Sequence, residues 1–346
     1  MYLNNSTILV TGGTGSFGQE FTGLALKQIP KAVRIFSRGE NLQRDMSHHF
    51  SSDMLRFFIG DVRDKERLHR AMTDVDYVIH AAALKQIPTC EYNPREAVLT
   101  NIIGSLNLID AAIDSGVKKV IALSTDKACQ PLNLYGATKQ VMEKLLVQAN
   151  VYSKDTLFSC VRYGNVVGSR GSIIPLFLEQ KKRGYVTITD TRMTRFWITL
   201  AQGADFVMSS LEHMQGGEIF VPKIPSMKLT DLADVVVPGV DKVEVGIRPG
   251  EKLHETLMTE EESRRAKEFD NYYTIQPEFP FWNMELDGRV PPEGFVYSSN
   301  TNTEWLSPRE MGDIVLTVLT DTETRHGRMI DAITNELENM RSNKNE

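Results

Sequence analysis

The chain has 346 residues, 41% of them hydrophobic, and carries a formal net charge of −6. The apolar content supports a folded core, and the acidic balance argues against a nucleic-acid-binding surface, which needs a basic surplus. Cys90, Cys129 and Cys160 form no C-x-x-C pair, so we expect neither a disulfide framework nor a bound metal. We expect a cytoplasmic protein without a membrane span, because no signal-peptide pattern and no run of ~18 apolar residues is present.

Short apolar runs alternate with longer amphipathic segments along the first half of the chain. The helices that we expect include Lys65–Thr73, Pro94–Ser115 and Gly136–Ala149. Continuous apolar strands separated by helices predict a parallel sheet covered on both faces, hence a doubly wound Rossmann α/β fold. The predicted strands are 7–11, 32–37, 55–60, 75–80, 119–124 and 157–164.

This alternation weakens after Asn165, where shorter elements and arginine-rich segments follow. We expect an NADP-binding Rossmann domain over residues 1–165, with 196–222 returning to it through a strand at 217–222. A smaller α/β substrate-binding lobe would comprise 166–195 and 223–281. Residues 282–346 would be a C-terminal extension of unknown role, with an amphipathic helix at Arg328–Met340.

A glycine-rich turn joins the first predicted strand to a helix that begins near Ser16. Gly12, Gly15 and Gly18 follow the strand with G-x-x-G-x-x-G spacing. Glycines permit the tight turn and the close approach of backbone to pyrophosphate, and the helix offers free N–H groups at its start. A glycine triplet alone is weak evidence, but this one lies between a strand and a helix and predicts a dinucleotide site.

The residues after the next two predicted strands bear on which dinucleotide binds. An NAD site usually has an acidic residue after the second strand for the ribose 2′-hydroxyl, whereas this chain has Ser37 and Arg38. A hydroxyl and a guanidinium suit a 2′-phosphate, so we expect NADP; the alternative is a solvated arginine at a strand end. Asp61, after the third strand, could accept a hydrogen bond from the adenine amino group or cap a turn.

An acid, a phenol and two amines follow the fifth predicted strand. Tyr135 and Lys139 are four residues apart, so they share one face of a helix. A nearby ammonium and an oxidised nicotinamide lower the pKa of a tyrosine from its ordinary ~10, and the phenolate can then take a proton from an alcohol. Asp126 and Lys127 have no role in such an oxidation. They either serve another chemical step or form a surface ion pair at the end of the strand.

The glycine turn and the Tyr-x-x-x-Lys pair together resemble the short-chain dehydrogenase/reductase superfamily, in its extended branch that modifies nucleotide sugars. Members that dehydrate a hexose with retention at C5 carry Thr-Asp-Glu where this chain has Thr125-Asp126-Lys127. The chain is instead similar to the inverting UDP-N-acetylglucosamine 4,6-dehydratases of pseudaminic acid synthesis and flagellin glycosylation. The resemblance fades beyond Phe281, and it is carried by HAAALKQIP, LSTDKA, NLYGATK, RYGNVVGSRGS, RMTRFWITL, PKIPSMK and IRPGEKLHE.

This resemblance implies a lyase that makes UDP-2-acetamido-2,6-dideoxy-β-L-arabino-hex-4-ulose, a UDP-4-keto-6-deoxy-L-hexose, with tightly bound NADP. Tyr135 would deprotonate O4 as C4 is oxidised, and Lys139 would hold the nicotinamide ribose. Lys127 would remove the C5 proton, which requires that its pKa fall by about three units from ~10.4 or that the proton be shared with a neighbour. Asp126 would protonate the departing C6 hydroxyl, before hydride returns to C6 and C5 is protonated from the opposite face.

The contacts expected for the two ligands extend beyond these catalytic residues. The expected cofactor contacts are Gly12, Thr14, Gly15, Ser16, Phe17, Gly18, Ser37, Arg38, Asp61, Val62, Ala81, Lys85, Thr125, Tyr135 and Lys139. The expected UDP-sugar contacts are Lys85, Lys127, Asn165, Arg170, Arg195, Arg248 and Glu251.

Two other functions could use the same elements. A UDP-hexose C4 epimerase would need Tyr135 and Lys139 but has no role for Asp126 and Lys127, and its product would not lose water. A catalytically silent NADP-binding regulator would tend to lose Tyr135 or Lys139, and both are present. We also expect a homo-oligomer, a dimer or a hexamer.

Overall fold

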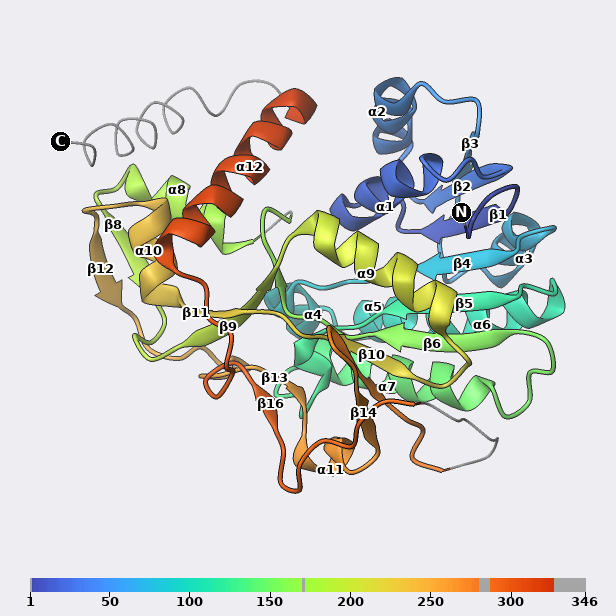
Figure 1. Cartoon of the computed structure of the whole chain (residues 1–346). Helices are drawn as coiled ribbons and strands as arrows, with labels where there is room; N and C mark the ends of the chain where they lie inside the picture. The colour runs from blue at the N-terminus through green and yellow to red at the C-terminus, as the bar shows by residue number, and fades with distance from the viewer. Residues whose placement is uncertain (1, 170–171, 280–286, 327–346) are drawn as a thin grey trace.

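Helices cover both faces of a long, mostly parallel sheet in the computed structural model, which describes residues 2–169, 172–279 and 287–326 (Figure 1). Within these residues the sheet has nine strands in the order β14-β15-β10-β6-β5-β4-β1-β2-β3. The strands from β10 to β3 are parallel, and β15 and β14 add antiparallel at one edge. The predicted doubly wound Rossmann fold is therefore confirmed. The strands are β1 (Thr7–Thr11), β2 (Ala32–Ser37), β3 (Leu55–Ile59), β4 (Tyr77–His80), β5 (Lys119–Leu123), β6 (Leu157–Val161), β10 (Ile219–Pro222), β14 (Ala266–Glu268) and β15 (Tyr272–Ile275).

The helices around this sheet lie in two layers. In Figure 1, α1 and α9, which pack against each other, lie on one face of the sheet, and α6 and α7 lie on the other. These helices and turns are α1 (Ser16–Leu26), α2 (Glu40–Phe50), α3 (Lys65–Met72), α4 (Ile87–Tyr92), α5 (Pro94–Val98), η1 (Leu99–Ile103), α6 (Gly104–Asp114), η2 (Asp126–Ala128), α7 (Leu134–Ala149) and α9 (Leu200–His213).

Two helix boundaries differ from the sequence-based prediction. The expected single helix from Pro94 contains a π-helical turn, η1, between α5 and α6. The next helix, α7, begins before Gly136 because Asn133 caps it, its side-chain oxygen accepting the Gly136 N–H at 2.8 Å. The helix predicted at Arg328–Met340 lies outside the described residues.

A second group of elements packs around its own apolar core. Trp197, Phe177 and Met311 are among the buried side chains of this core. The small sheets here pair β11-β9-β7, β12-β8 and β13-β16. Although they fall within the expected lobe, β14 and β15 extend the large sheet. The elements are β7 (Asn165–Val166), α8 (Ile173–Lys181), β8 (Tyr185–Ile188), β9 (Thr194–Ile198), β11 (Ser226–Lys228), α10 (Leu229–Val236), β12 (Asp241–Glu244), β13 (Thr256–Met258), α11 (Glu260–Ser263), β16 (Tyr297–Ser298) and α12 (Pro308–His326).

A buried arginine after β6 joins the large sheet to the segment around α11. Arg162 is 1% exposed and donates to Glu143 of α7 at 2.6 and 3.0 Å and to Glu262 of α11 at 2.9 and 3.0 Å. It also donates to the carbonyl of Leu257 in β13 at 2.9 Å. Because removing one partner would leave a buried charge uncompensated, this network strongly favours one docking position for the segment that carries β13 and α11.

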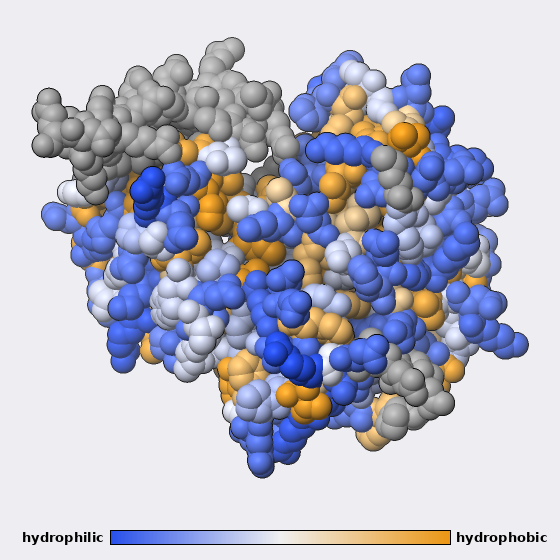
Figure 2. All heavy atoms as spheres, viewed as in Figure 1, coloured by the Kyte–Doolittle hydropathy of each residue, from blue (hydrophilic) through white to orange (hydrophobic). Residues whose placement is uncertain are grey.

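The helical stretch Pro94–Asp114 is long and apolar enough to cross a membrane by length and composition, although half of it is buried inside the structure. Helices packed in a protein core share this composition, and α6 packs against α3 and α7. The face of the molecule in Figure 2 is mostly hydrophilic, with smaller apolar areas between the hydrophilic ones.

A glycine sets how closely η2 approaches α7. A Cβ atom built on Gly136 would lie 2.1 Å from the carbonyl oxygen of Lys127 and 3.1 Å from Pro131. The missing side chain therefore lets the turn that carries Lys127 rest directly on the first turn of the helix that carries Tyr135.

We predict that Gly136→Ala separates η2 from α7 and lowers the free energy of unfolding by about 1–3 kcal/mol, as overpacking does. Urea unfolding followed by circular dichroism measures this change. The matched control is Gly203→Ala in α9, where an added Cβ meets no heavy atom within 4 Å. That control should stabilise the protein by up to about 1 kcal/mol, since alanine is the better helix former. Equal stability of the two variants would contradict the prediction.

Candidate active site

A cavity of about 800 Å³ opens at the carboxyl ends of β1, β4 and β5. The strand order reverses beside β1, and ligands of doubly wound folds bind at such a reversal. Many of the residues singled out in the sequence line it: Gly12, Thr14, Gly15, Ser16, Phe17, Gly18, Ser37, Arg38, Asp61, Val62, Ala81, Lys85, Thr125, Lys127, Tyr135, Lys139 and Asn165.

The glycine turn forms one end of this cavity. Gly12 has a φ of +67°, and a Cβ there would lie 2.8 Å from the backbone nitrogen of Ala82. A Cβ on Gly18 would lie 2.5 Å from Gly13, so α1 packs tightly on the turn. Gly15 caps the 11-residue helix α1 without a side-chain hydrogen bond, and the first residues of this helix line the cavity. This backbone surface suits a pyrophosphate.

Charged groups already pair where the second and third strands end. Arg38 lies 3.6 Å from Asp61, and Arg63 binds the same carboxylate at 2.6 Å. Burial acts to raise the pKa of Asp61, but the hydrogen bonds and charges of Arg63 and the charge of Arg38 outweigh it and lower the pKa. Asp61 is therefore an ionised acceptor, and Arg38, whose side chain is 59% exposed, remains accessible to an anion.

Tyr135 and Lys139 share one wall of the cavity, but their surroundings differ. Burial raises the pKa of Tyr135 to about 12, against the lowering effects of the Lys127 charge and a hydrogen bond with Thr125. Burial lowers the pKa of Lys139 to about 8, and its amine donates to the Leu123 carbonyl at 2.7 Å. In the free protein Tyr135 therefore keeps its proton, although the charge of Lys127 acts to lower its pKa.

The sequence analysis missed Asn101, which lies in the π-helical turn η1. Its side chain exchanges hydrogen bonds with the backbone of Leu84, at 2.8 and 2.9 Å, directly before Lys85. It also donates to Thr138 at 3.0 Å, and Thr138 donates to the Tyr135 carbonyl at 2.8 Å. Asn101 therefore fixes the position of two cavity segments relative to each other.

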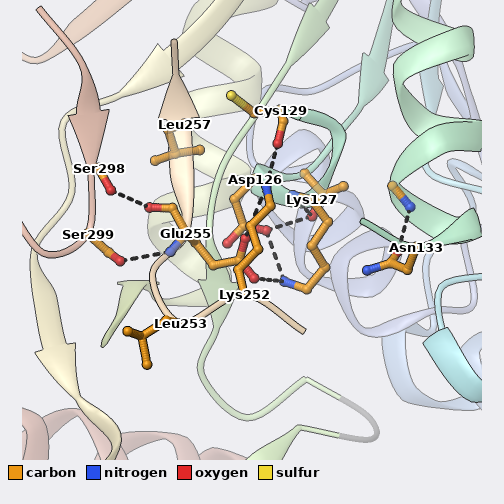
Figure 3. Close-up of polar contacts among 12 residues, drawn as sticks. Asp126, Lys127, Cys129, Asn133, Lys252, Leu253, Glu255, Leu257, Ser298 and Ser299 are labelled. Atoms are coloured by element: carbon orange, nitrogen blue, oxygen red, sulfur yellow. Dashed lines mark hydrogen bonds and ion pairs between the residues drawn. The ribbon is translucent and has the colours of Figure 1, made fainter. Parts of the chain in front are cut away.

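Lys127 lies between two buried carboxylates (Figure 3). Its amine is 3.0 Å from Asp126 and 3.7 Å from Glu255, which is 3% exposed and precedes β13. Burial acts to lower the pKa of Lys127, but the charges of Asp126 and Glu255 outweigh burial and raise it. The direction is opposite to the fall in pKa that a lysine base requires, and the geometry instead favours a proton shared with a carboxylate.

Asp126 lies behind Lys127, outside the set of residues that line the cavity. It is fully buried, and its Oδ1 accepts hydrogen bonds from Thr125 at 2.9 Å and from Lys127 at 3.0 Å. Its Oδ2 has no hydrogen-bond partner among the described residues. In this conformation Asp126 reaches the cavity through the amine of Lys127.

The residues expected to contact substrate differ in how they are placed. Lys85 and Asn165 line the cavity, whereas Arg195, Arg248 and Glu251 do not. The buried guanidinium of Arg195 donates to the carbonyls of residues 194, 252 and 253. Arg248 pairs with Glu251 at 3.7 Å. Arg170 lies outside the described residues.

Several buried polar atoms on the cavity wall lack a hydrogen-bond partner within the described part of the chain. An unpaired buried polar group costs about 1–3 kcal/mol, so a native protein usually leaves one where a ligand supplies the partner. These atoms belong to Thr100, Ser124, Asn165, Ser172 and Trp197.

Comparisons with known proteins agree with this geometry. The chain is 52% identical over 326 residues to a Campylobacter jejuni protein named UDP-N-acetylglucosamine 4,6-dehydratase (inverting). The alignment covers 90% of this chain and 98% of that protein. It is 42% identical over 328 residues to a Rickettsia conorii protein named UDP-glucose 4-epimerase, covering 91% and 96% of the two chains. The solved structure of Pen from Bacillus thuringiensis, 39% identical, aligns with a TM-score of 0.85 over 92% of this chain and 99% of that one. A family model described as polysaccharide biosynthesis protein matches residues 8–277, and the chain belongs to that family.

Proposed function

We propose that this protein is an inverting UDP-N-acetylglucosamine 4,6-dehydratase that uses NADP as an internal redox cofactor. The observation that carries the proposal is the position of Lys127 and Tyr135 on one cavity wall that continues into the glycine turn. A dehydratase needs a second proton acceptor beside the oxidation pair, and Lys127 is an ionisable group in that place. The 52% identity to a protein with this name supports the same assignment.

The cavity residues fit a dinucleotide. The glycine turn and the start of α1 would hold the pyrophosphate, Arg38 and Ser37 the 2′-phosphate, and Lys139 the nicotinamide ribose. When bound, the nicotinamide would supply a hydride acceptor for C4 and a positive charge near Tyr135 in its oxidised form, and a hydride donor for C6 in its reduced form.

The protein's own groups move the protons. Tyr135 takes the O4 proton as C4 is oxidised, and its pKa of about 12 in the free protein means that it ionises only in the loaded site. Lys127 takes the C5 proton, which the C4 ketone acidifies. Its amine must first pass its own proton on, and Asp126 at 3.0 Å is the nearest acceptor. Asp126 then returns that proton, through Lys127, toward the departing C6 hydroxyl.

A UDP-hexose C4 epimerase is the second candidate, because several Rickettsia relatives bear the name UDP-glucose 4-epimerase. Epimerisation uses Tyr135, Lys139 and the cofactor, but it requires no base at C5. The paired carboxylates around Lys127 would then have no chemical task, so the dehydratase accounts for more of the site.

The proposal also includes the biological setting. The product would enter pseudaminic acid synthesis and flagellin glycosylation in the cytoplasm. Assembly as a dimer or hexamer is supported by apolar side chains exposed on the helices from α4 to α7, among them Tyr92 (88% exposed), Val98, Ile103 and Val141.

We predict that the purified protein incubated with UDP-N-acetylglucosamine in deuterated water forms a 4-keto sugar lighter by one water, with deuterium at C5 and the L configuration. NMR and mass spectrometry measure these properties. A product of unchanged mass with inverted C4 would establish the epimerase instead, and unchanged substrate with bound cofactor would exclude both enzymes.

We predict that Lys127→Ala lowers the rate of C5 exchange by about 10²–10⁴-fold, the usual contribution of a general base. Transient reduction of the cofactor by hydride from C4 of the sugar should persist, because Tyr135 and Lys139 are retained. Lys144→Ala is the control, since that exposed amine pairs with Glu278 and lies outside the cavity. Wild-type exchange in Lys127→Ala would remove Lys127 from the mechanism.

We predict that Arg38→Ala weakens the binding of NADP about tenfold, as expected for the loss of one charge-assisted contact to phosphate, and leaves NAD binding unchanged. Isothermal titration calorimetry with both cofactors measures the difference. An equal loss for NAD and NADP would show that Arg38 does not recognise the 2′-phosphate.

A further inference from the structure

Glu255 is a buried carboxylate that the proposed mechanism does not use. It is 3% exposed, and its Oε2 accepts no hydrogen bond from the described residues. Three cations surround it: Lys127 at 3.7 Å, Arg195 at 3.9 Å and Lys252 at 3.9 Å. Burying a carboxylate costs several kcal/mol unless it is well paired, so its position beside the candidate base calls for a functional explanation.

The backbone around Glu255 is held from the C-terminal side of the chain. The Glu255 N–H donates to the Ser299 hydroxyl at 3.0 Å, and the Glu255 carbonyl accepts from the Ser299 N–H at 2.8 Å. The Ser298 hydroxyl donates to the same carbonyl at 3.2 Å (Figure 3). Thr194 of β9 contacts both His254 and Ser299, at 2.8 and 2.7 Å. Glu255 is therefore fixed by Ser298 and Ser299, which follow the last strand of the large sheet, and it faces a lysine that precedes α7.

The charged groups around Lys127 sum to zero when the Lys127 amine is neutral. Asp126 and Glu255 contribute two negative charges, and Arg195 and Lys252 contribute two positive ones. The ammonium of Lys127 is therefore the surplus charge of this cluster, although the two carboxylates that it contacts stabilise it. Lys85 and Tyr135 line the cavity beside this amine. Burial and then the Lys127 charge lower the pKa of Lys85, whereas the Lys127 charge only partly offsets the burial that raises the pKa of Tyr135. Adding or removing one charge here must change how readily Lys127 releases its proton.

We infer that Glu255 is a positioning residue: it holds the amine of Lys127 at the cavity wall and sets the affinity of that amine for a proton. The inference rests on the proposed function, in which Lys127 exchanges a proton with C5. Glu255 does not line the cavity, and of the three cations around it Lys127 is the one that does, so Glu255 acts on the substrate through Lys127.

The test is the pH profile of C5 deuterium exchange from UDP-N-acetylglucosamine by the holoenzyme. The rate should rise with pH as the Lys127–Asp126 pair loses the proton that the two groups share. Removing the Glu255 charge favours the neutral amine, so Glu255→Gln should move the midpoint of this rise to lower pH by about one unit or more. Removing a neighbouring cation has the opposite sign, so Lys252→Gln should move the midpoint to higher pH. Glu255→Asp retains the charge and should keep the wild-type midpoint, even where its rate falls.

Glu278→Gln is the control for a lost carboxylate, because Glu278 is exposed and pairs with Lys144. A purely structural role for Glu255 predicts lower stability or rate with unshifted midpoints, and that result would overturn the inference. If Glu255→Gln does not fold, the direction of the Lys252→Gln shift decides. If the wild-type holoenzyme exchanges the C5 proton but Glu255→Gln and Lys252→Gln both keep the wild-type pH midpoint, the dehydratase proposal is retained and the role of Glu255 is excluded. A wild-type holoenzyme that neither exchanges C5 nor releases water overturns both.

Discussion

The close contact between Gly136 and the Lys127 carbonyl determines the geometry on which the chemistry depends. It places the turn after β5 on the first helical turn of α7, so that an amine and a phenol from different elements meet at one wall. A bulkier residue in α7 would keep the two apart without changing either side chain. The catalytic arrangement is therefore a consequence of backbone packing as much as of residue type.

Electrostatics then determine what these groups can do before ligands bind. In the free protein burial keeps the proton on Tyr135, and the charges of Asp126 and Glu255 keep it on Lys127. In the proposed mechanism, these groups exchange protons only after a cofactor and a sugar exclude water and change the local charge. Burial lowers the pKa of Lys139 to about 8, and its amine donates to a carbonyl and a methionine sulfur. The two lysines of this site thus differ in proton affinity because burial dominates at Lys139, whereas at Lys127 the charges of two carboxylates outweigh it.

The sequence carries enough local information to predict the sheet, the glycine turn and the residues that follow the parallel strands. Strand and helix periodicity are local, and the carboxyl ends of parallel strands meet at one edge by geometry. Glu255 could not be predicted as a neighbour of Lys127, because β13 approaches η2 only through tertiary packing, including the Arg162 network. The role of Arg195 was equally hidden, since a sequence does not show whether a guanidinium turns to a ligand or to backbone carbonyls. The side-chain cap that starts α7 early, and the register of the antiparallel edge strands, also depend on contacts between distant segments.

The π-helical turn at Leu99–Ile103 affects how related chains can be compared. A π turn holds one more residue than an α turn, so it is equivalent to a single-residue insertion within a continuous helix. Asn101 reaches Leu84 and Thr138 from this widened turn. An ungapped alignment with a relative whose helix is regular would match Asn101 to a residue on a different face. A relative that appears to lack this asparagine could therefore differ only by a deletion in the helix, and helix length is the property to inspect first.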